Sequence, residues 1–335
     1  MKVPTIVFPE PRRVAIEEWE LAEPGPGQVL VRTTASVIST GTELTALTGD
    51  FPPGRSAWAR YVRYPFPAGY SMAGEVVALG PGVEAVQVGD HVCGAGRHAT
   101  HSVLNARGLR RIPAGIADEA AAFRTMAEIT LNGVRLSQMI FGEALAIVGM
   151  GLVGQLAAQW ARFAGALPLI GLDLSARRLD LAAQIGPLVR IQPGQEDQVE
   201  AVRAATRGRM ADAVIEATGD PNVLPGAVKL ARRNGRVVLL GSPRGATTID
   251  MHEEVHTLGL HLIGAHNGTH PRVETPGNPW TGDRDGELFL DLLAGGHAHI
   301  QELITHRYAW QQAPDAYAVL LADRTQALGV VLEWG

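Results

Sequence analysis

A glycine-rich segment and a later aspartate are the residues whose spacing most clearly indicates chemistry in this chain. The glycines are Gly149, Gly151 and Gly154, and Asp173 follows about 20 residues later. In such a pattern the first glycine permits a tight turn and the second lets the backbone approach a pyrophosphate. The third glycine lets a helix pack closely on a strand, and the carboxylate accepts hydrogen bonds from ribose hydroxyls. The pattern predicts a dinucleotide site.

The elements around these glycines have the required order. An apolar run at 145–149 predicts a buried strand, and the residues from Leu152 and Val153 onward have helical periodicity. A second apolar run at 168–172 ends at Asp173. Because the first N–H groups of a helix have no intrahelical acceptor, we expect those of Leu152 and Val153 to face phosphate oxygens.

The region that follows alternates between strand and helix patterns, which predicts a doubly wound parallel sheet. The expected strands are 188–191, 212–216, 235–240 and 261–264, and the expected helices are 175–184, 196–205 and 222–233. Ligands of such sheets lie at the carboxyl ends of the strands. We therefore expect Thr218, Gly241 and Ser242, which follow two of these strands, to flank the nicotinamide and its ribose.

The first 120 residues are typical of a small, closed antiparallel unit. Strand patterns at 28–37 and 74–79 are separated by loops rich in glycine and proline. Helices are expected near 284–294 and over 308–321, followed by a strand at 328–332 that could return to the first domain. The predicted domains are therefore 1–122 with 268–335, and 123–267.

The composition restricts the class of protein. A net charge of −5 over 335 residues gives no reason to expect a nucleic-acid partner. The only cysteine, Cys93, excludes an internal disulfide and a multi-thiolate metal site. The N-terminal residues do not have the pattern of a signal peptide, and no apolar run is long enough to span a membrane. We expect a cytoplasmic protein without a membrane partner.

Beyond the glycine pattern, several short motifs resemble those of the medium-chain dehydrogenase/reductase superfamily, over almost the whole chain. They lie at 24–31, 39–44, 73–80 and 88–92. Segments at 39–43, 131–135, 303–307 and 313–317 are most similar to the branch that contains bacteriochlorophyllide-type dehydrogenases. The resemblance implies an α/β protein that combines a GroES-like, β-rich substrate domain with a Rossmann domain.

The chain departs from zinc-dependent members of this superfamily at the metal ligands. Thr40 stands at the position of the cysteine ligand, and Tyr70 stands at that of the histidine ligand. The region of the third ligand, 123–126, contains neither a thiolate nor a carboxylate, and the lobe with four further cysteines is missing. Hydroxyl groups do not replace thiolate and imidazole as zinc ligands, so we expect no zinc.

Two histidines are spaced as a metal pair could be. His98 and His101 have two residues between them. On a strand, that spacing would place them on opposite faces, because side chains alternate from one face to the other. We therefore predict no metal site there.

Without a metal, hydroxyl groups must stabilise the oxygen that reacts. The resemblance implies that Thr42 is the hydroxyl that relays the proton and that Glu43 is the acidic residue beside it. Our hypothesis is that Tyr70 and Thr42 polarise the substrate oxygen while Glu43 orients them. Two alternatives stay open: Tyr70 fills the volume of the lost ligand, or Glu43 forms a salt bridge with an arginine.

The resemblance also implies further contacts. His266 and Asn267 would lie at the edge of the nicotinamide, although the sequence leaves open that His266 is a dimer-interface or solvent residue. Arg178 would bind the adenosine ribose, and two copies of the chain would join through an edge strand near 260–265. Asp173 favours NAD, because a carboxylate repels the 2′-phosphate of NADP. The arginine pair at 177–178 leaves NADP possible.

The leading interpretation is a zinc-independent, NAD-linked oxidoreductase that interconverts a secondary alcohol and its ketone. A quinone or enoyl reductase that uses NADPH is the second, and a nucleotide-binding protein without catalysis is the third. The aromatic loop at 49–64 is expected to line the entrance to the substrate site, and Trp280 could join it.

Overall fold

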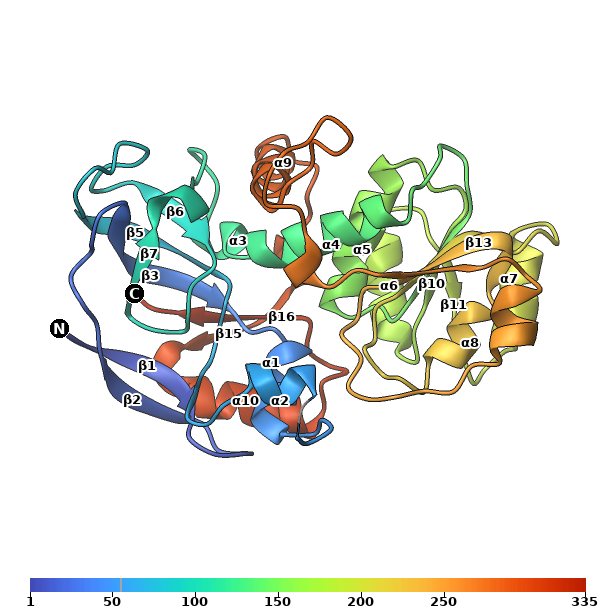
Figure 1. The fold of residues 1–335 in the computed structure, drawn as a ribbon, viewed down its shortest axis with the longest axis horizontal. Helices are drawn as coiled ribbons and strands as arrows, with labels where there is room; N and C mark the ends of the chain where they lie inside the picture. Colours follow the sequence, from blue (N-terminus) through green and yellow to red (C-terminus); the bar gives the residue numbers. More distant parts are fainter. Residues whose placement is uncertain (55) are drawn as a thin grey trace. The chain divides into compact units, whose positions relative to one another are not determined.

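The computed structural model describes residues 1–54 and 56–335, which form two compact units (Figure 1). The first unit contains residues 1–128 and 283–335, and the second contains residues 129–282. Both limits of the second unit lie further along the chain than the expected limits of 123–267. In the described ranges, no helix combines the length and the apolar character that crossing a membrane requires.

The first unit is built on a seven-stranded sheet around the long strand β3, Gln28–Val37. Over most of β3 every second residue is buried, as expected for a strand with one face toward the core. The last strand of the chain pairs antiparallel with β3, so the chain returns to its first unit as the sequence predicted. The other strands of this sheet are β5 (Met72–Leu79), β6 (His91–Gly94), β7 (His101–Asn105), β8 (Arg110–Arg111), β15 (Ile304–Ala309) and β16 (Gly329–Glu333).

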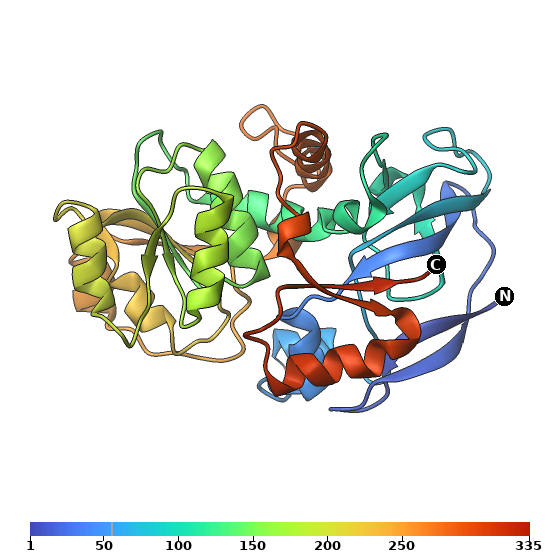
Figure 2. The same cartoon turned by 180° about the vertical axis from the view of Figure 1, so that it is seen from behind.

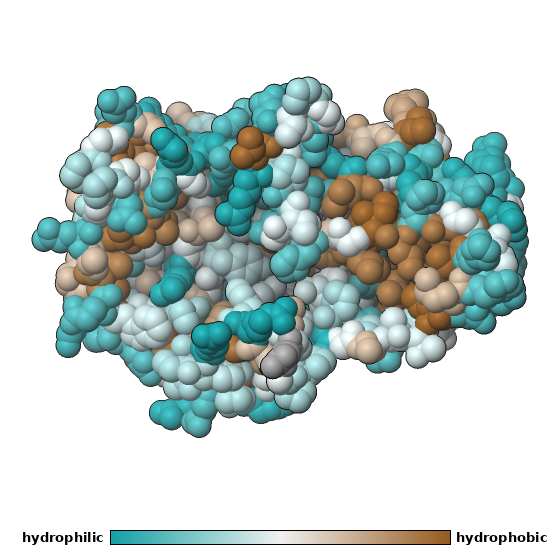
Figure 3. All heavy atoms as spheres, in the orientation of Figure 1, coloured by the Kyte–Doolittle hydropathy of each residue, from teal (hydrophilic) through white to brown (hydrophobic). Residues whose placement is uncertain are grey.

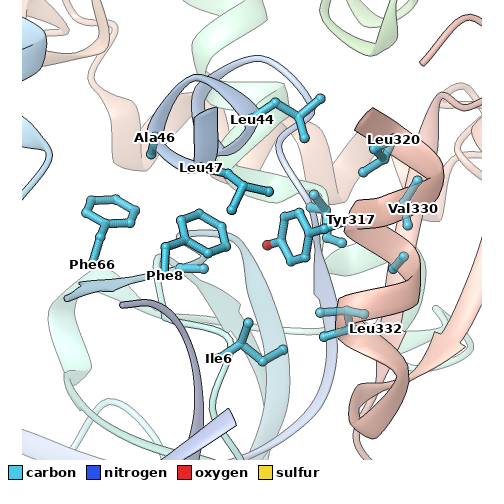
Figure 4. Close-up of a cluster of buried hydrophobic side chains, with 14 of the residues drawn as sticks. Ile6, Phe8, Leu44, Ala46, Leu47, Phe66, Tyr317, Leu320, Val330 and Leu332 are labelled. Atoms are coloured by element: carbon cyan, nitrogen blue, oxygen red, sulfur yellow. The ribbon is translucent and has the colours of Figure 1, made fainter. Parts of the chain in front are cut away.

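A second, three-stranded sheet and several helices complete this unit. The sheet has the order β2-β1-β4, with β1 (Lys2–Phe8), β2 (Ala15–Glu20) and β4 (Phe66–Pro67). The helices are α1 (Thr42–Thr48), α2 (Ala57–Tyr61), α3 (Asp118–Ala121), α9 (Gly282–Ala294) and α10 (Ala313–Ala322), with short helical turns at Ala106–Gly108, Gln301–Leu303 and Trp310–Gln312. Buried side chains from both sheets and from α1 and α10 form one core (Figure 4). In it, the ring of Tyr317 packs edge-on against Phe8, with 5.2 Å between the ring centroids.

The second unit is a six-stranded parallel sheet with the order β11-β10-β9-β12-β13-β14. The strands are β9 (Leu145–Val148), β10 (Leu169–Leu172), β11 (Val189–Ile191), β12 (Ala211–Glu216), β13 (Ala231–Leu239) and β14 (His261–Gly264). Every residue of β9 and β10 is buried, because helices cover both faces of the sheet (Figures 1 and 2). The helices are α4 (Arg124–Leu136), α5 (Leu152–Phe163), α6 (Ala176–Ile185), α7 (Gln198–Ala205) and α8 (Leu224–Val228), with helical turns at Met251–His256 and Asn267–Thr269.

The β-rich first unit and the doubly wound sheet confirm the predicted α/β fold class. In the sheet, β10 lies on one side of β9 and β12 lies on the other. The strand order therefore reverses at β9, and the loop after β9 starts at the switch point where such folds bind ligands. This loop contains the glycine-rich segment.

Two predicted helices were too long. The helix expected over 222–233 ends at Val228, and β13 already begins at Ala231. The helix expected over 308–321 begins at Ala313, because the preceding residues extend β15 and form a short helical turn. In both cases pairing with a neighbouring strand overrides the local helical pattern, which only the tertiary structure reveals.

The glycines after β9 have the expected steric roles. Gly149 has a φ of +94°, and a Cβ added there would lie 2.6 Å from the Thr218 methyl carbon. A Cβ at Gly154 would overlap the carbonyl oxygen of Gly149, so α5 packs directly on the turn. A Cβ at Gly151 would meet only a guanidinium nitrogen of Arg178, at 3.9 Å. Gly154 is therefore required by packing, whereas Gly151 leaves space beside the backbone.

This difference predicts the stability of two variants. Gly154→Ala should lower the free energy of unfolding by about 1–3 kcal/mol, because the added methyl group overpacks the turn. Gly151→Ala is the matched control, since Gly151 has a φ of −67° that alanine adopts without strain. Denaturant unfolding of both variants measures the effect, and equal stabilities would contradict the packing role of Gly154.

Candidate active site

Asp173 lies at the end of β10, directly beside the glycine-rich turn. One carboxylate oxygen accepts a hydrogen bond from the Met150 N–H at 2.7 Å, and the other accepts one from the Ser175 N–H at 2.8 Å. The guanidinium of Arg178 lies 3.8 Å from the first of these oxygens. The structure therefore brings together the predicted ribose residues, Asp173 and Arg178, with the turn that precedes Leu152.

A buried glutamine supports this turn, and the sequence analysis missed it. The Gln155 side-chain amide donates to the Met150 carbonyl at 3.2 Å and to the Arg178 carbonyl at 2.7 Å. It thus ties the turn to helix α6. The feature of the sequence that could have indicated this role is that Gln155 is a polar residue among the apolar residues of the buried face of α5.

The loops after β12 and β13 touch each other at the carboxyl end of the sheet. Gly219 has a φ of +66°, and a Cβ there would lie 2.8 Å from the carbonyl oxygen of Ser242. A Cβ on Gly241 would overlap the N–H of Gly219. Thr218, Gly241 and Ser242 therefore lie together, as the sequence predicted from strand geometry.

Glu216, the last residue of β12, holds this arrangement and was not predicted from the sequence. Its buried carboxylate accepts a hydrogen bond from the Thr218 N–H at 2.6 Å, another from the Thr218 hydroxyl, and one from the Gly219 N–H at 3.4 Å. Burial raises the pKa of the Glu216 carboxyl, and the hydrogen bonds from Thr218 and Gly219 oppose this shift.

His266 and Asn267 follow β14, the last strand of the sheet. Both are exposed, and the imidazole Nδ1 of His266 accepts a hydrogen bond from the Gly268 N–H at 3.0 Å. The coenzyme residues expected from the sequence thus follow five parallel strands, β9, β10, β12, β13 and β14. Because the carboxyl ends of parallel strands share one edge, these loops lie at the same edge of the sheet.

In the first unit, hydroxyl groups gather around Tyr70, the residue for which the resemblance implies the position of a zinc ligand. The Tyr70 hydroxyl donates to the Ser39 hydroxyl at 2.6 Å and lies 3.4 Å from the Thr42 hydroxyl. The sulfur of Met126, from the region of the expected third ligand, is 3.8 Å from the Tyr70 hydroxyl. Tyr70 and Thr42 are brought together as predicted, and Ser39 and Met126 are additions that the sequence analysis missed.

Tyr70 is held as a neutral phenol. Burial raises the pKa of the Tyr70 hydroxyl, and the negative charge of Glu43 raises it further, whereas the hydrogen bonds with Ser39 and Thr42 lower it. The net direction is upward, so the phenol keeps its proton at neutral pH and acts as a hydrogen-bond donor. Thr40 is partly exposed, and none of the hydrogen bonds found among the described residues joins it to Tyr70.

Glu43 is buried at the start of α1 and has partners that the sequence did not indicate. One carboxylate oxygen accepts a hydrogen bond from the Ser39 N–H at 2.8 Å. The other lies 3.1 Å from the His98 imidazole and accepts the hydroxyl proton of Tyr317. The expected alternative, a salt bridge from Glu43 to an arginine, is wrong, because a histidine and a tyrosine occupy those positions.

His98 lies in the segment before β7, whereas His101 is the first residue of that strand. The prediction that both histidines lie on one strand, facing opposite sides, is therefore wrong for His98. His98 is fully buried and contacts Ser36 and Glu43, whereas His101 contacts the Thr100 hydroxyl at 3.3 Å. The two histidines do not form a pair.

The donor atoms around Tyr70 do not fit zinc. They are hydroxyl oxygens and a thioether, whereas zinc in proteins is bound by thiolate, imidazole and carboxylate groups. Within residues 1–54 and 56–335, no group of three or more histidine, cysteine, aspartate or glutamate residues could hold a metal ion. Burial raises the pKa of the Cys93 thiol to about 12, so this sulfur stays protonated.

Aromatic side chains from the loop at 49–64 pack on one another. The rings of Phe51 and Trp58 stack with their centroids 6.2 Å apart, and Tyr61 meets Trp58 at 6.3 Å. Burial and the charge of Glu43 raise the pKa of Tyr61. Residue 55 of this loop lies outside the described residues. Trp280 belongs to the second unit, where the Arg135 guanidinium lies 3.3 Å from its ring centroid.

Known proteins match this chain over both units. Residues 25–129 match the family model described as alcohol dehydrogenase GroES-like domain, and residues 153–277 match the one described as zinc-binding dehydrogenase. L-threonine 3-dehydrogenase from Pyrococcus horikoshii is 30% identical in an alignment of length 343, which covers 92% of each chain. D-guloside 3-dehydrogenase from Escherichia coli K12 is 25% identical over 331 residues, with 93% of this chain and 94% of the relative covered.

The solved structures agree in fold. An alcohol dehydrogenase from Escherichia coli CFT073, complexed with NADH, superimposes with a TM-score of 0.81 at 20% identity, and 99% of each chain is covered. At this identity the likeness shows the fold alone. Together with the relatives and the two family models, it establishes the two domains as a GroES-like domain and a Rossmann domain. The chain belongs to the zinc-type alcohol dehydrogenase-like medium-chain dehydrogenase/reductase superfamily and is an NAD(P)-dependent oxidoreductase.

Proposed function

We propose that this protein interconverts a secondary alcohol and its ketone with NAD as coenzyme, and that it does so without zinc. The observation that carries the proposal is the neutral Tyr70 hydroxyl, held by Ser39 and Thr42 at the position for which the resemblance implies a metal ligand. A protonated phenol supplies a hydrogen bond to an oxygen that becomes negative, which is the task that a Lewis acid performs in metal-dependent enzymes.

When bound, the nicotinamide would donate a hydride to the carbonyl carbon or accept one from the alcohol carbon. The work of the protein is at the substrate oxygen. In the reductive direction, the Tyr70 hydroxyl turns its one proton from Ser39 to the carbonyl oxygen and then gives this proton to the alkoxide that forms. Thr42 and Ser39 keep the phenol aligned and relay to the phenolate a replacement proton that comes from solvent water. In the oxidative direction, the same hydroxyl groups carry the alcohol proton away.

Two relatives support a secondary hydroxyl as the reacting group. Their names describe a 3-dehydrogenase of threonine and a 3-dehydrogenase of a guloside. The aromatic rings of Phe51, Trp58 and Tyr61, which pack on one another in the loop at 49–64, would suit a ring-bearing or polyhydroxylated substrate.

The oxygen chemistry predicts how two variants behave. In Tyr70→Phe the hydrogen bond to the reacting oxygen is lost, so kcat for ketone reduction should fall about 100-fold or more. Thr42→Val should lower kcat less, because Thr42 is the more distant partner of the phenol. A panel of ketones and secondary alcohols with NADH or NAD measures both rates. Tyr308→Phe is the control, because Tyr308 stacks on His306 in β15.

Near-normal turnover in both variants would remove Tyr70 and Thr42 from the mechanism. Turnover of enones but not of ketones would favour the quinone or enoyl reductase, and coenzyme binding without any turnover would favour a nucleotide-binding protein. Zinc independence is tested on the same material. A strong chelator followed by gel filtration should leave kcat unchanged, and stoichiometric zinc in active protein would refute it.

The preference for NAD follows from the charge beside the ribose. Asp173 would accept hydrogen bonds from ribose hydroxyls and repel a 2′-phosphate. Asp173→Ser should therefore weaken NADH binding and shift the ratio of the NADH and NADPH dissociation constants toward NADPH by about tenfold or more. Coenzyme fluorescence titration measures the ratio, and an unchanged ratio would contradict the role of Asp173.

We also propose that two copies pair through β14, the edge strand of the Rossmann sheet. Every residue of β14 is at least partly exposed, including Leu262 at 37%. The hydropathy view places a broad apolar area on this unit, around the region that carries β13 (Figures 1 and 3). An exposed strand edge with apolar side chains is a template for pairing with another strand.

The pairing predicts the outcome of a charge substitution. Leu262→Glu would place a carboxylate on the proposed interface and should convert a dimer into a monomer in sedimentation experiments. Val88→Glu is the matched control, because Val88 is 58% exposed on a loop of the other unit. A wild-type monomer, or dimers of both variants, would refute this interface.

A further inference from the structure

A buried chain of hydrogen bonds runs from the C-terminal strand to the hydroxyl cluster. The Trp334 indole N–H donates to the Ser36 hydroxyl at 2.8 Å, and Ser36 lies 2.7 Å from Nδ1 of His98. On the other side of the ring, Nε2 of His98 lies 3.1 Å from the Glu43 carboxylate. We call Trp334, Ser36, His98 and Glu43 the buried chain. All four side chains are within the core of the first unit.

The chemistry of the donors fixes the direction of this chain. An indole N–H only donates, so the Ser36 oxygen must be its acceptor. The Ser36 hydroxyl then has its own proton available for Nδ1 of His98. With Nδ1 as an acceptor, the imidazole proton lies on Nε2 and is donated to Glu43. A neutral imidazole and an ionised carboxylate satisfy every polar group of the chain.

The doubly protonated imidazole fits less well. In that state Nδ1 would donate to the Ser36 oxygen, which already accepts from Trp334. The Ser36 hydroxyl proton would then need another acceptor, and the hydrogen bonds of the described residues provide none. A buried hydroxyl without an acceptor costs free energy, so the arrangement favours the neutral Nε2–H tautomer.

The buried chain ends at Glu43, which holds Tyr70 in place through Ser39. The Glu43 oxygen not bonded to His98 accepts the Ser39 N–H at 2.8 Å, and the Ser39 hydroxyl accepts the Tyr70 proton at 2.6 Å. Tyr317 donates to the same Glu43 oxygen as His98 does. The carboxylate is therefore fixed by three donors, and it fixes the backbone of Ser39.

His98 also touches the backbone next to Tyr70. Gly69 has a φ of +90°, and a Cβ added there would lie 2.5 Å from the backbone nitrogen of His98 and 2.6 Å from the Cγ atom of its ring. The His98 N–H donates to the Ala68 carbonyl at 2.9 Å. His98 thus supports Tyr70 by two routes, one through Glu43 and Ser39 and one through Gly69.

We propose that His98 is a positioning residue for the Tyr70 hydroxyl, acting as the neutral Nε2–H tautomer that orients Glu43 and thereby Ser39. The proposal rests on the proposed function for the task of Tyr70. It differs from it in naming a residue that touches neither substrate nor coenzyme. Nothing in the reaction requires His98 to change its protonation.

Two amide substitutions distinguish the roles of the two imidazole nitrogens, Nδ1 and Nε2. In His98→Gln the amide nitrogen reaches the place of Nε2 and can donate to Glu43. In His98→Asn the amide reaches only the place of Nδ1, so the Glu43 oxygen loses this donor. Because a hydrogen bond to a buried charge is among the strong ones, kcat should fall about tenfold or more in His98→Asn and about threefold or less in His98→Gln.

His101→Gln is the matched control, because His101 has no contact with Glu43, and it should keep the wild-type kcat. The NADH dissociation constant should stay unchanged in all three variants, because the coenzyme loops belong to the second unit. Denaturant unfolding shows whether each variant is folded. Equal kcat values for folded His98→Asn and His98→Gln would overturn the proposal.

Two spectroscopic measurements test the proposal without any substrate. Nitrogen NMR of histidine-labelled protein should show His98 protonated at Nε2 and not at Nδ1, with the signal assigned from the His98→Gln variant. Carbon NMR of tyrosine-labelled protein, assigned through Tyr70→Phe, should show a shifted Tyr70 phenol signal in His98→Asn but not in His101→Gln.

The two sets of results distinguish the proposals from each other. An imidazole protonated at Nδ1, or a Tyr70 signal that His98→Asn does not move, would overturn the positioning role whatever the enzyme turns over. If the spectra are as expected but no carbonyl compound is reduced, the buried chain holds Tyr70 as inferred, and the proposed function is the part that fails.

Discussion

The arrangement of the first unit depends on one buried carboxylate. Glu43 accepts hydrogen bonds or close contacts from Ser39, His98 and Tyr317, which come from segments far apart in the sequence. Burying a charge is costly unless several donors compensate for it, so the segments that supply those donors must come together for the unit to fold. The same compensation leaves the Tyr70 hydroxyl next to a fixed negative charge. The Glu43 carboxylate therefore contributes both to the folding of this unit and to the surroundings of the Tyr70 hydroxyl.

In the second unit, the geometry of the parallel sheet brings the loops of the coenzyme site together. Its sheet is parallel, so every loop that follows a strand emerges at the same edge, and the reversal of strand order at β9 separates the two halves of that edge. The steric requirements of Gly154 and Gly241 bring the backbone of these loops into direct contact. Glu216 repeats, on a smaller scale, the way in which Glu43 organises its surroundings, because both are buried carboxylates that bind backbone N–H groups.

The sequence was sufficient where a local pattern determines a local structure. The glycine spacing, the buried strands and Asp173 were predicted because each has a steric or chemical signature within a short segment. The residues Ser39, His98, Gln155 and Glu216 were missed, since a buried polar group is recognised only once its distant partner is known. The helix limits near 228 and 313 were wrong for a related reason, because pairing with a neighbouring strand decided them.

The close approach of Gly69 to His98 has a consequence for how such an enzyme can change. The backbone before Tyr70 has no room for a side chain, because a Cβ on Gly69 would overlap His98. The residue before the phenol is therefore restricted to glycine. Adaptation to a larger or smaller substrate would have to come from the aromatic loop at 49–64. The reaction at Tyr70 would then stay the same, while changes in the loop at 49–64 alter the range of substrates.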